Sequence, residues 1–201
     1  SFQAGSSILE FGCGFGRLTR HLVALAPAAA IAGCDVLGRC VETCRRRCPS
    51  ATFVRNEWRP PLPFEDGRFD LVFSYSVFTH LSEPNHRDWL KELARVLRPD
   101  GVMLHTTHSH ECLARMATFS PGSLAKYALG TDVPTFVARG TSYHYVVDDP
   151  ARPEYGLAII SEAYVRECWP RHSGLRLAAY TAGAIEAYPE GCQDIVILQK
   201  S

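Results

Sequence analysis

Three glycines follow a short apolar run at alternate positions in the stretch Ile8-Leu9-Glu10-Phe11-Gly12-Cys13-Gly14-Phe15-Gly16-Arg17. The apolar run predicts a strand at Ser7–Phe11, and the residues after the glycines predict a helix over Arg17–Leu25. Gly12, Gly14 and Gly16 let a ligand approach the backbone, because glycine has no side chain and tolerates positive φ. The free N–H groups at the start of the helix then face that ligand. The stretch therefore predicts a strand, a tight loop and a helix around a nucleotide-type cofactor pocket.

The spacing of these glycines separates two classes of cofactor. A dinucleotide fingerprint reads G-x-G-x-x-G, and from Gly12 it would place its third glycine where the chain has Arg17. The pattern Glu10-x-Gly12-x-Gly14-x-Gly16 instead resembles the first motif of the class I S-adenosylmethionine-dependent methyltransferases. An ordinary strand-to-helix turn can also carry glycines, so this resemblance needs further motifs to support it.

Length and composition exclude several classes of function. The chain has 201 residues, enough for one domain with a substantial core, and its 21 basic residues balance 21 acidic ones. It has no run of about 20 apolar residues that would span a membrane. Cys40, Cys44 and Cys48 recur at helical spacing without the paired hooks typical of zinc sites, so we expect no metal. We therefore expect a cytoplasmic protein that binds neither nucleic acid nor a membrane.

Apolar runs alternate with helical patterns as far as about Ser109, which is typical of βαβ units with a parallel sheet. The predicted strands are Ser7–Phe11, Ala30–Cys34, Thr52–Arg55, Phe69–Ser74 and Val102–Thr107. The predicted helices between them are Arg17–Leu25, Arg39–Arg47 and His86–Leu97. Proline and Asp-Gly in Arg98-Pro99-Asp100-Gly101 end the last helix in a turn.

The pattern changes after Ser109. Residues 110–157 form a long insertion with helical pieces at Glu111–Thr118 and Ser123–Leu129, and we interpret it as a lid or a substrate wall, or else as an excursion without ligand contact. A helix over Ser161–Trp169 follows, with Ser161 as its cap. Strands at Leu175–Tyr180 and Asp194–Gln199 end the chain, and the short loop between them makes them antiparallel.

Further motifs support the resemblance to the methyltransferases over nearly the whole chain. The segment from Pro60 to Val72 is similar to the family's "LPF…FD-L-V" lead into its fourth strand, and Arg98-Pro99-Asp100-Gly101 resembles the turn before its fifth. The implied fold is α/β: a Rossmann-like, doubly wound, mostly parallel seven-stranded sheet in one domain, 1–201, with an antiparallel C-terminal hairpin. Family members carry a helical segment before the first strand. We therefore interpret this chain as a trimmed or naturally short form, with a pocket that is more open or completed by a partner.

The resemblance also implies which residues hold S-adenosylmethionine. Asp35 ends the second strand, where an acid can accept both ribose hydroxyls. Asn56 stands where the family reads the adenine edge, and backbone carbonyls near Ser74 meet the methionine amino group, with Glu10 facing the same ammonium-bearing moiety. The full expected cofactor-binding set is Glu10, Gly12, Cys13, Gly14, Gly16, Arg17, Asp35, Val36, Asn56, Glu57, Ser74 and Tyr75, and Trp58 can cover a ring or pack in the core.

Methyl transfer is an in-line displacement that needs a base only when the nucleophile must lose a proton, so the sequence reveals the cofactor more readily than the catalytic residue. His80 follows the fourth strand and is the candidate general base, with a structural or cofactor-contacting role as the alternative. His105, His108 and His110 lie near the end of the fifth strand, but alternation puts His105 and His108 on opposite faces.

Tyr143 and His144 in the insertion are candidates for lining an acceptor pocket. No Asp/Asn-Pro-Pro-Tyr follows the fourth strand, which argues against adenine methylation in nucleic acid.

The sequence therefore predicts methyl transfer from S-adenosylmethionine to an oxygen, nitrogen or carbon of a small-molecule acceptor, with release of S-adenosylhomocysteine. Two alternatives stay open: a non-catalytic module that binds the cofactor in a regulatory or scaffolding role, and a nicotinamide-dependent oxidoreductase, which Arg17 disfavours. A homodimer is a further expectation about partners.

Overall fold

The computed structural model describes residues 5–119, 142–185 and 193–201, and its centre is a seven-stranded sheet. The strands of this sheet are β1 (Ser7–Phe11), β2 (Ala30–Asp35), β3 (Thr52–Arg55), β4 (Phe69–Ser74), β5 (Leu97–Thr107), β8 (Arg176–Ile185) and β9 (Gln193–Gln199). They lie in the order β3-β2-β1-β4-β5-β9-β8. The first five are parallel, whereas β9 runs antiparallel to both β5 and β8. The predicted fold class, with its antiparallel C-terminal hairpin, is confirmed.

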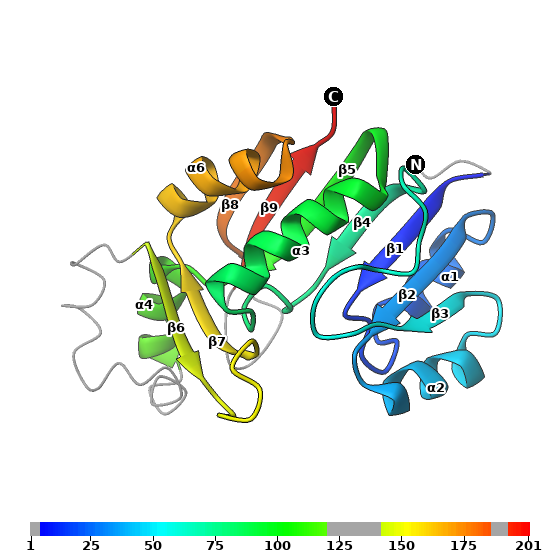
Figure 1. Cartoon of the computed structure of the whole chain (residues 1–201), viewed down its shortest axis with the longest axis horizontal. Coiled ribbons are helices and arrows are strands. Elements are labelled where there is room, and N and C mark those ends of the chain that lie inside the picture. Colours follow the sequence, from blue (N-terminus) through cyan, green and yellow to red (C-terminus); the bar gives the residue numbers. More distant parts are fainter. Residues whose placement is uncertain (1–4, 120–141, 186–192) are drawn as a thin grey trace.

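Five helices of the described residues connect and cover these strands: α1 (Thr19–Leu25), α2 (Gly38–Arg47), α3 (Glu83–Val96), α4 (His110–Phe119) and α6 (Glu162–Ser173). Figure 1 shows α3 and α6 lying together across one face of the sheet. Their apolar sides bury Trp89, Leu93 and Trp169 completely or almost completely against the strands. In the part of the chain that the structure describes, no helix is both long and apolar enough to cross a membrane.

Several element boundaries differ from the predicted ones for local reasons. Helix α3 begins one turn before His86, because Ser82 has an extended backbone and Pro84 fits the first turn. Strand β5 begins at Leu97, so the Arg98–Gly101 turn is part of the strand segment, with Asp100 at a φ of 60°. Helix α6 continues through Pro170 to Ser173, and its cap Ser161 accepts a hydrogen bond from the N–H of Tyr164, as predicted.

The insertion contains a second, two-stranded sheet that the sequence did not predict. Strands β6 (Tyr143–Val147) and β7 (Gly156–Ile160) pair antiparallel, and α4 matches the predicted helix over Glu111–Thr118. The predicted helix Ser123–Leu129 lies outside the described residues.

The loop after β4 joins the start of β7 through backbone hydrogen bonds. The N–H of Gly156 donates to the carbonyl of His80 over 2.7 Å, that of Ala158 donates to Thr79 over 2.8 Å, and that of Ser82 donates to Glu154 over 3.0 Å. The insertion is therefore fastened to the sheet edge where parallel strands end.

Candidate functional site

The glycine loop between β1 and α1 is a tight turn fixed by backbone hydrogen bonds. The N–H groups of Gly12 and Cys13 both donate to the carbonyl of Cys34 over 2.9 Å, and Gly16 donates to Cys13 over 2.9 Å. All three glycines have positive φ, of 75° at Gly12, 51° at Gly14 and 76° at Gly16. A Cβ at Gly14 would meet no atom within 4 Å, so this side of the loop is open.

Asp35 links that loop to the segment after β2. One of its carboxylate oxygens accepts the N–H of Gly14 over 2.8 Å, and the other accepts the N–H of Leu37 over 2.9 Å. Each oxygen keeps a second lone pair for a ligand. Because the carboxyl ends of parallel strands meet at one sheet edge, Asp35 lies beside the residues that follow β1 and β4.

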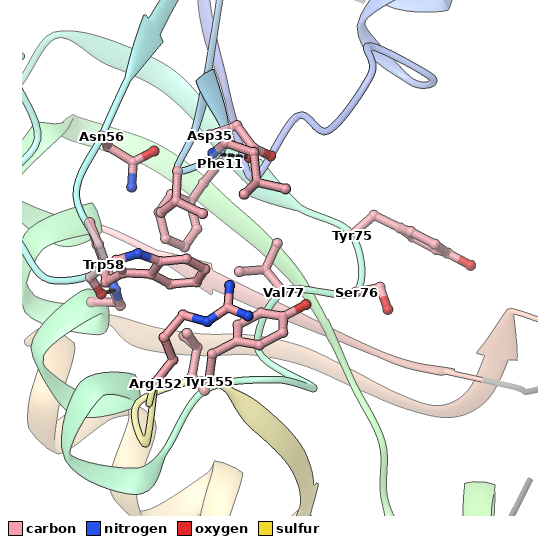
Figure 2. A pocket seen from close by; sticks show the side chains of 14 residues that line it. Phe11, Asp35, Asn56, Trp58, Tyr75, Ser76, Val77, Arg152 and Tyr155 are labelled. Atoms are coloured by element: carbon pink, nitrogen blue, oxygen red, sulfur yellow. Dashed lines mark hydrogen bonds between the residues drawn. The ribbon is translucent and has the colours of Figure 1, made fainter. Parts of the chain in front are cut away.

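A cavity of about 250 Å³ lies at this edge, as Figure 2 shows. Its walls come from the segments after β1, β2, β3 and β4 and from the loop between β6 and β7. The lining residues are Phe11, Gly12, Asp35, Val36, Leu37, Asn56, Trp58, Tyr75, Ser76, Val77, Leu81, Trp89, Arg152 and Tyr155. Five of the predicted cofactor-binding residues are among them: Gly12, Asp35, Val36, Asn56 and Tyr75.

Asn56 brings an amide oxygen with no hydrogen-bond partner to the cavity wall. The residue is 5% exposed, and its amide nitrogen donates to the carbonyl of Glu57 over 2.8 Å. Its Oδ1 is buried and makes no hydrogen bond. An orphaned buried acceptor costs free energy unless a ligand or water donates to it, so Asn56 is suited to bind an N–H group.

Glu10, by contrast, does not line the cavity. Its buried carboxyl accepts a hydrogen bond from the hydroxyl of Thr19 at the start of α1. Burial raises the pKa of Glu10 to about 7, and the hydrogen bond from Thr19 limits the rise. In this geometry Glu10 ties β1 to α1.

The rest of the predicted cofactor-binding set lies around the cavity without lining it: Cys13, Gly14, Gly16, Arg17, Glu57 and Ser74. The guanidinium of Arg17 lies over the ring of Tyr75, with its carbon 5.3 Å from the ring centroid. This cation–π contact joins the end of the glycine loop to the end of β4. The hydroxyl of Ser74 points instead toward β5, where it bonds to Nδ1 of His105 over 2.8 Å.

His80 lies behind the cavity wall. Its Nδ1 is 2.8 Å from the carbonyl oxygen of Gly156, and because a carbonyl only accepts, this nitrogen carries the proton. The ring stacks on the cavity-lining Tyr155, with centroids 4.9 Å apart and planes 11° apart. Burial lowers the pKa of His80. The imidazole is thus a neutral support for Tyr155, and its expected role as general base stays a prediction.

The other candidate residues of the sequence lie away from the cavity. His105 is completely buried, packs on Phe78 and Trp169, and has a pKa lowered to about 3 by burial. The hydroxyl of Tyr143 donates to the carbonyl of Leu81 over 2.8 Å. Like these two, His108, His110 and His144 do not line the cavity.

The sequence did not identify Arg152 and Tyr155 as site residues. Figure 2 shows both across the cavity from Asp35, next to Trp58. The guanidinium carbon of Arg152 lies 5.5 Å from the ring centroid of Trp58, and the rings of Trp58 and Tyr155 meet edge to face at 5.6 Å. Both lie in a Pro-rich link with no motif, and only the pairing of β6 with β7 brings them to the sheet edge.

Comparisons with known proteins identify the family of this chain. Residues 8–101 match a family described as a methyltransferase domain. A trans-aconitate 2-methyltransferase of Methylobacterium nodulans is 30% identical over 227 aligned residues, which cover 97% of this chain and 83% of that protein. A fatty-acid O-methyltransferase of Mycolicibacterium smegmatis is 38% identical over 104 residues, covering 51% of this chain and 37% of that protein.

Solved structures show the same fold at low sequence identity. A methyltransferase from Methanosarcina mazei aligns with a TM-score of 0.71 and 18% identity, over 99% of this chain and 94% of that one. A geranyl diphosphate methyltransferase aligns with a TM-score of 0.63 and 13% identity, over 100% of this chain and 74% of that one. Together with the relatives above, these matches show that the chain belongs to the class I S-adenosylmethionine-dependent methyltransferases, enzymes that use S-adenosylmethionine as methyl donor and release S-adenosylhomocysteine.

Proposed function

We propose that this enzyme transfers a methyl group to a carboxylate oxygen of a small organic acid. The observation that carries the proposal is the cationic side chain of Arg152 at the cavity, opposite the anionic Asp35. Guanidinium groups bind carboxylates through parallel N–H donors. Two relatives, the trans-aconitate and fatty-acid methyltransferases, are named for acids, which supports the same class of acceptor.

Arg152 keeps donors for such a ligand although it is already paired. Its Nε and Nη2 both donate to one oxygen of Asp149, over 2.9 and 2.8 Å, which leaves further guanidinium N–H groups. The pair is about half exposed, so its own contribution to stability is small. The side chain can therefore turn from Asp149 to an acid at little cost.

A carboxylate acceptor also fits the position of His80. Carboxylic acids are ionised at neutral pH, so their oxygen attacks without losing a proton to the enzyme. The proposal needs no general base, and a neutral imidazole that supports Tyr155 is compatible with it. A hydroxyl or amine acceptor would need a general base, and His80 is then the candidate for that role.

We further propose where the cofactor lies. The carboxylate of Asp35 would accept the ribose hydroxyls, and Val36 would pack on the adenosine. The unpartnered oxygen of Asn56 would accept the adenine amino group. The open side of the loop at Gly14 would leave room for the methionine moiety, whose ammonium would meet the backbone carbonyls of Ser74 and Tyr75. The sulfonium of the bound cofactor supplies the activated methyl group, and the residues here orient it and exclude water.

The remaining expected roles are part of the same proposal. Glu10, Cys13 and Gly16 would shape the loop from behind, while Arg17 and Glu57 would flank the methionine and adenine ends. We propose a single domain over 1–201 with a lid-like insertion at about 110–157. It would work in the cytoplasm without nucleic acid, as a monomer or a homodimer.

Turnover with a panel of acceptors tests the proposal. The enzyme is incubated with S-adenosylmethionine and an acid, its amide or its alcohol analogue, and S-adenosylhomocysteine release is measured. Acids should give products that mass spectrometry and mild alkaline hydrolysis identify as methyl esters. Turnover of alcohols or amines with inert acids would contradict the proposal.

The variant Arg152→Ala tests the role of the guanidinium. It should raise KM for acids about tenfold or more, the scale of a charged hydrogen bond, and leave S-adenosylhomocysteine affinity unchanged. Arg171→Ala is the matched control, because Arg171 also pairs with an acid, Glu167, on the exposed side of α6. A loss of cofactor affinity in Arg152→Ala would instead show that the guanidinium binds the cofactor and not the acid.

A further inference from the structure

Ser76 has a backbone conformation that serine rarely adopts. It lies two residues after the end of β4 with a φ of 58°, in the left-handed region that favours glycine. Only Asp100 shares a positive φ among the described non-glycine residues. Ser76 lines the cavity, and Figure 2 shows it on the segment after β4, between Tyr75 and Val77. Such strain persists where surrounding contacts fix it, and it is common at functional sites.

Hydrogen bonds from two other strands hold Ser76 in this conformation. Its N–H donates to the hydroxyl of Thr106 in β5 over 2.8 Å. The side-chain amide of Gln193, the first residue of β9, donates to the Ser76 hydroxyl oxygen over 3.0 Å. Thr79 lies farther away, with its hydroxyl at 3.3 Å. Gln193 donates to the Ser76 oxygen, and in the contact with Thr79 either hydroxyl can be the donor. The Ser76 proton can therefore be donated to a ligand when Thr79 acts as the donor to Ser76.

The same sheet edge holds two buried polar atoms without a partner. Gln193 is 6% exposed and its Oε1 makes no hydrogen bond, and the hydroxyl of the completely buried Thr107 makes none either. Thr107 pairs with Asp194, the neighbour of Gln193, so both atoms lie at one end of β5 and β9. Unpartnered buried groups are rare in native proteins and indicate a bound ligand or water.

We propose that the Ser76 hydroxyl donates a hydrogen bond to the carboxylate of the methyl acceptor, and that Gln193 is the positioning residue that orients this hydroxyl. The inference rests on the proposed function, because it takes an acid as the acceptor. The strained backbone and the hydrogen bonds from Thr106 and Gln193 fix the hydroxyl before the acid binds, which reduces the entropy lost on binding. Ser76 is then a specificity-determining residue on the β4 side of the cavity.

Two variants of Ser76 separate the hydroxyl from the backbone strain. Ser76→Ala and Ser76→Gly both remove the hydroxyl, but only glycine relieves the positive φ. Each is saturated with S-adenosylhomocysteine and titrated calorimetrically with trans-aconitate and with decanoate. We expect both variants to bind the better acid about 5- to 20-fold more weakly than the wild type, with S-adenosylhomocysteine affinity within about twofold. Wild-type acid affinity in Ser76→Gly would overturn the inference.

A double-variant cycle tests the role of Gln193. Gln193→Leu should weaken acid binding about three- to tenfold in the wild type and have no further effect in the Ser76→Gly background, because it acts through the hydroxyl. Additive losses would contradict this. If the wild type forms methyl esters while the Ser76 variants bind acids normally, only this inference fails. If acids are neither bound nor methylated, the proposed function fails and the inference falls with it.

Discussion

The side chain of Val77 occupies the position that a Cβ on Gly12 would need. Its Cγ2 lies well inside van der Waals contact of that position, and Gly12 has a φ of 75°. The loop after β1 and the loop after β4 therefore touch only because one of the two residues has no side chain. This contact forms part of the cavity wall.

Gly12→Ala should consequently destabilise the fold more than Gly14→Ala. Both substitutions place alanine at positive φ, which costs about 1–2 kcal/mol, but only the one at Gly12 also meets a side chain. Urea unfolding measures the difference, which should exceed about 1 kcal/mol because the clash adds strain. The double variant Gly12→Ala/Val77→Ala should recover part of the loss. Equal destabilisation by the two single variants would show that the contact with Val77 is unimportant.

Asp35→Ala should weaken cofactor binding by about 1.5–3 kcal/mol, the scale of hydrogen bonds to a charged group. It also removes the acceptor for the N–H groups of Gly14 and Leu37, so the loop should loosen in the absence of cofactor. Calorimetry with S-adenosylhomocysteine measures the affinity, and the exposed Asp88→Ala serves as the control. Unchanged affinity of Asp35→Ala for S-adenosylhomocysteine would contradict the proposal that Asp35 binds the ribose hydroxyls.

His80→Asn distinguishes a base from a support. Asparagine can still donate to the Gly156 carbonyl, but it cannot take a proton. With an acid as acceptor, kcat should fall less than about tenfold, because a general base contributes roughly 10²–10⁴ and a carboxylate needs none. The pH profile of kcat between pH 6 and 9 should match the wild type. A larger fall, together with the loss of a titration step, would establish His80 as the base.

Stability should decrease as the pH falls below about 6.5. His105 has a native pKa of about 3, and burial holds the pKa of His86 well below its usual value, so only the unfolded chain takes up these protons. Each histidine costs up to about 1.4 kcal/mol per pH unit across that window. Burial raises the pKa of Glu10 to about 7, so uptake of its proton stabilises the folded state as the pH falls from 7 to 4.5. This is one group against two histidines, and the net stability therefore still decreases.

Urea unfolding at several pH values measures this dependence. His105→Asn keeps a hydrogen-bonding group for the Ser74 hydroxyl and should reduce the slope by one proton. The exposed His21→Asn should leave the slope unchanged. An identical slope in His105→Asn and the wild type would show that His105 is not the origin of the acid sensitivity.

The sequence predicted those parts of the structure that local patterns determine. The glycine loop, the parallel strands and the capping by Ser161 each depend on residues close together in the chain, and the structure has all of them. Asp35 was predicted from its position at the end of the second strand and Asn56 from the resemblance to the methyltransferases, and both line the cavity.

Local sequence patterns did not predict the tertiary contacts of individual side chains. The motif predicted Glu10 as a cofactor ligand, but its carboxyl accepts a hydrogen bond from Thr19, nine positions later in the chain. His80 follows β4, a position that suggested a general base. Its Nδ1 instead bonds to the carbonyl of Gly156, which belongs to a hairpin that the sequence pattern did not predict. Arg152 and Tyr155 reach the cavity only through that hairpin, and Ser76 depends on Gln193 from the far end of the chain.

The backbone hydrogen bonds between the loop after β4 and the start of β7 have an evolutionary consequence. The segment that matches the family described as a methyltransferase domain, residues 8–101, ends before the insertion begins. Because main-chain groups make these bonds, they place few demands on side-chain identity. A lineage can therefore exchange the side chains of the insertion while it keeps the backbone contacts that hold the insertion against the loop after β4.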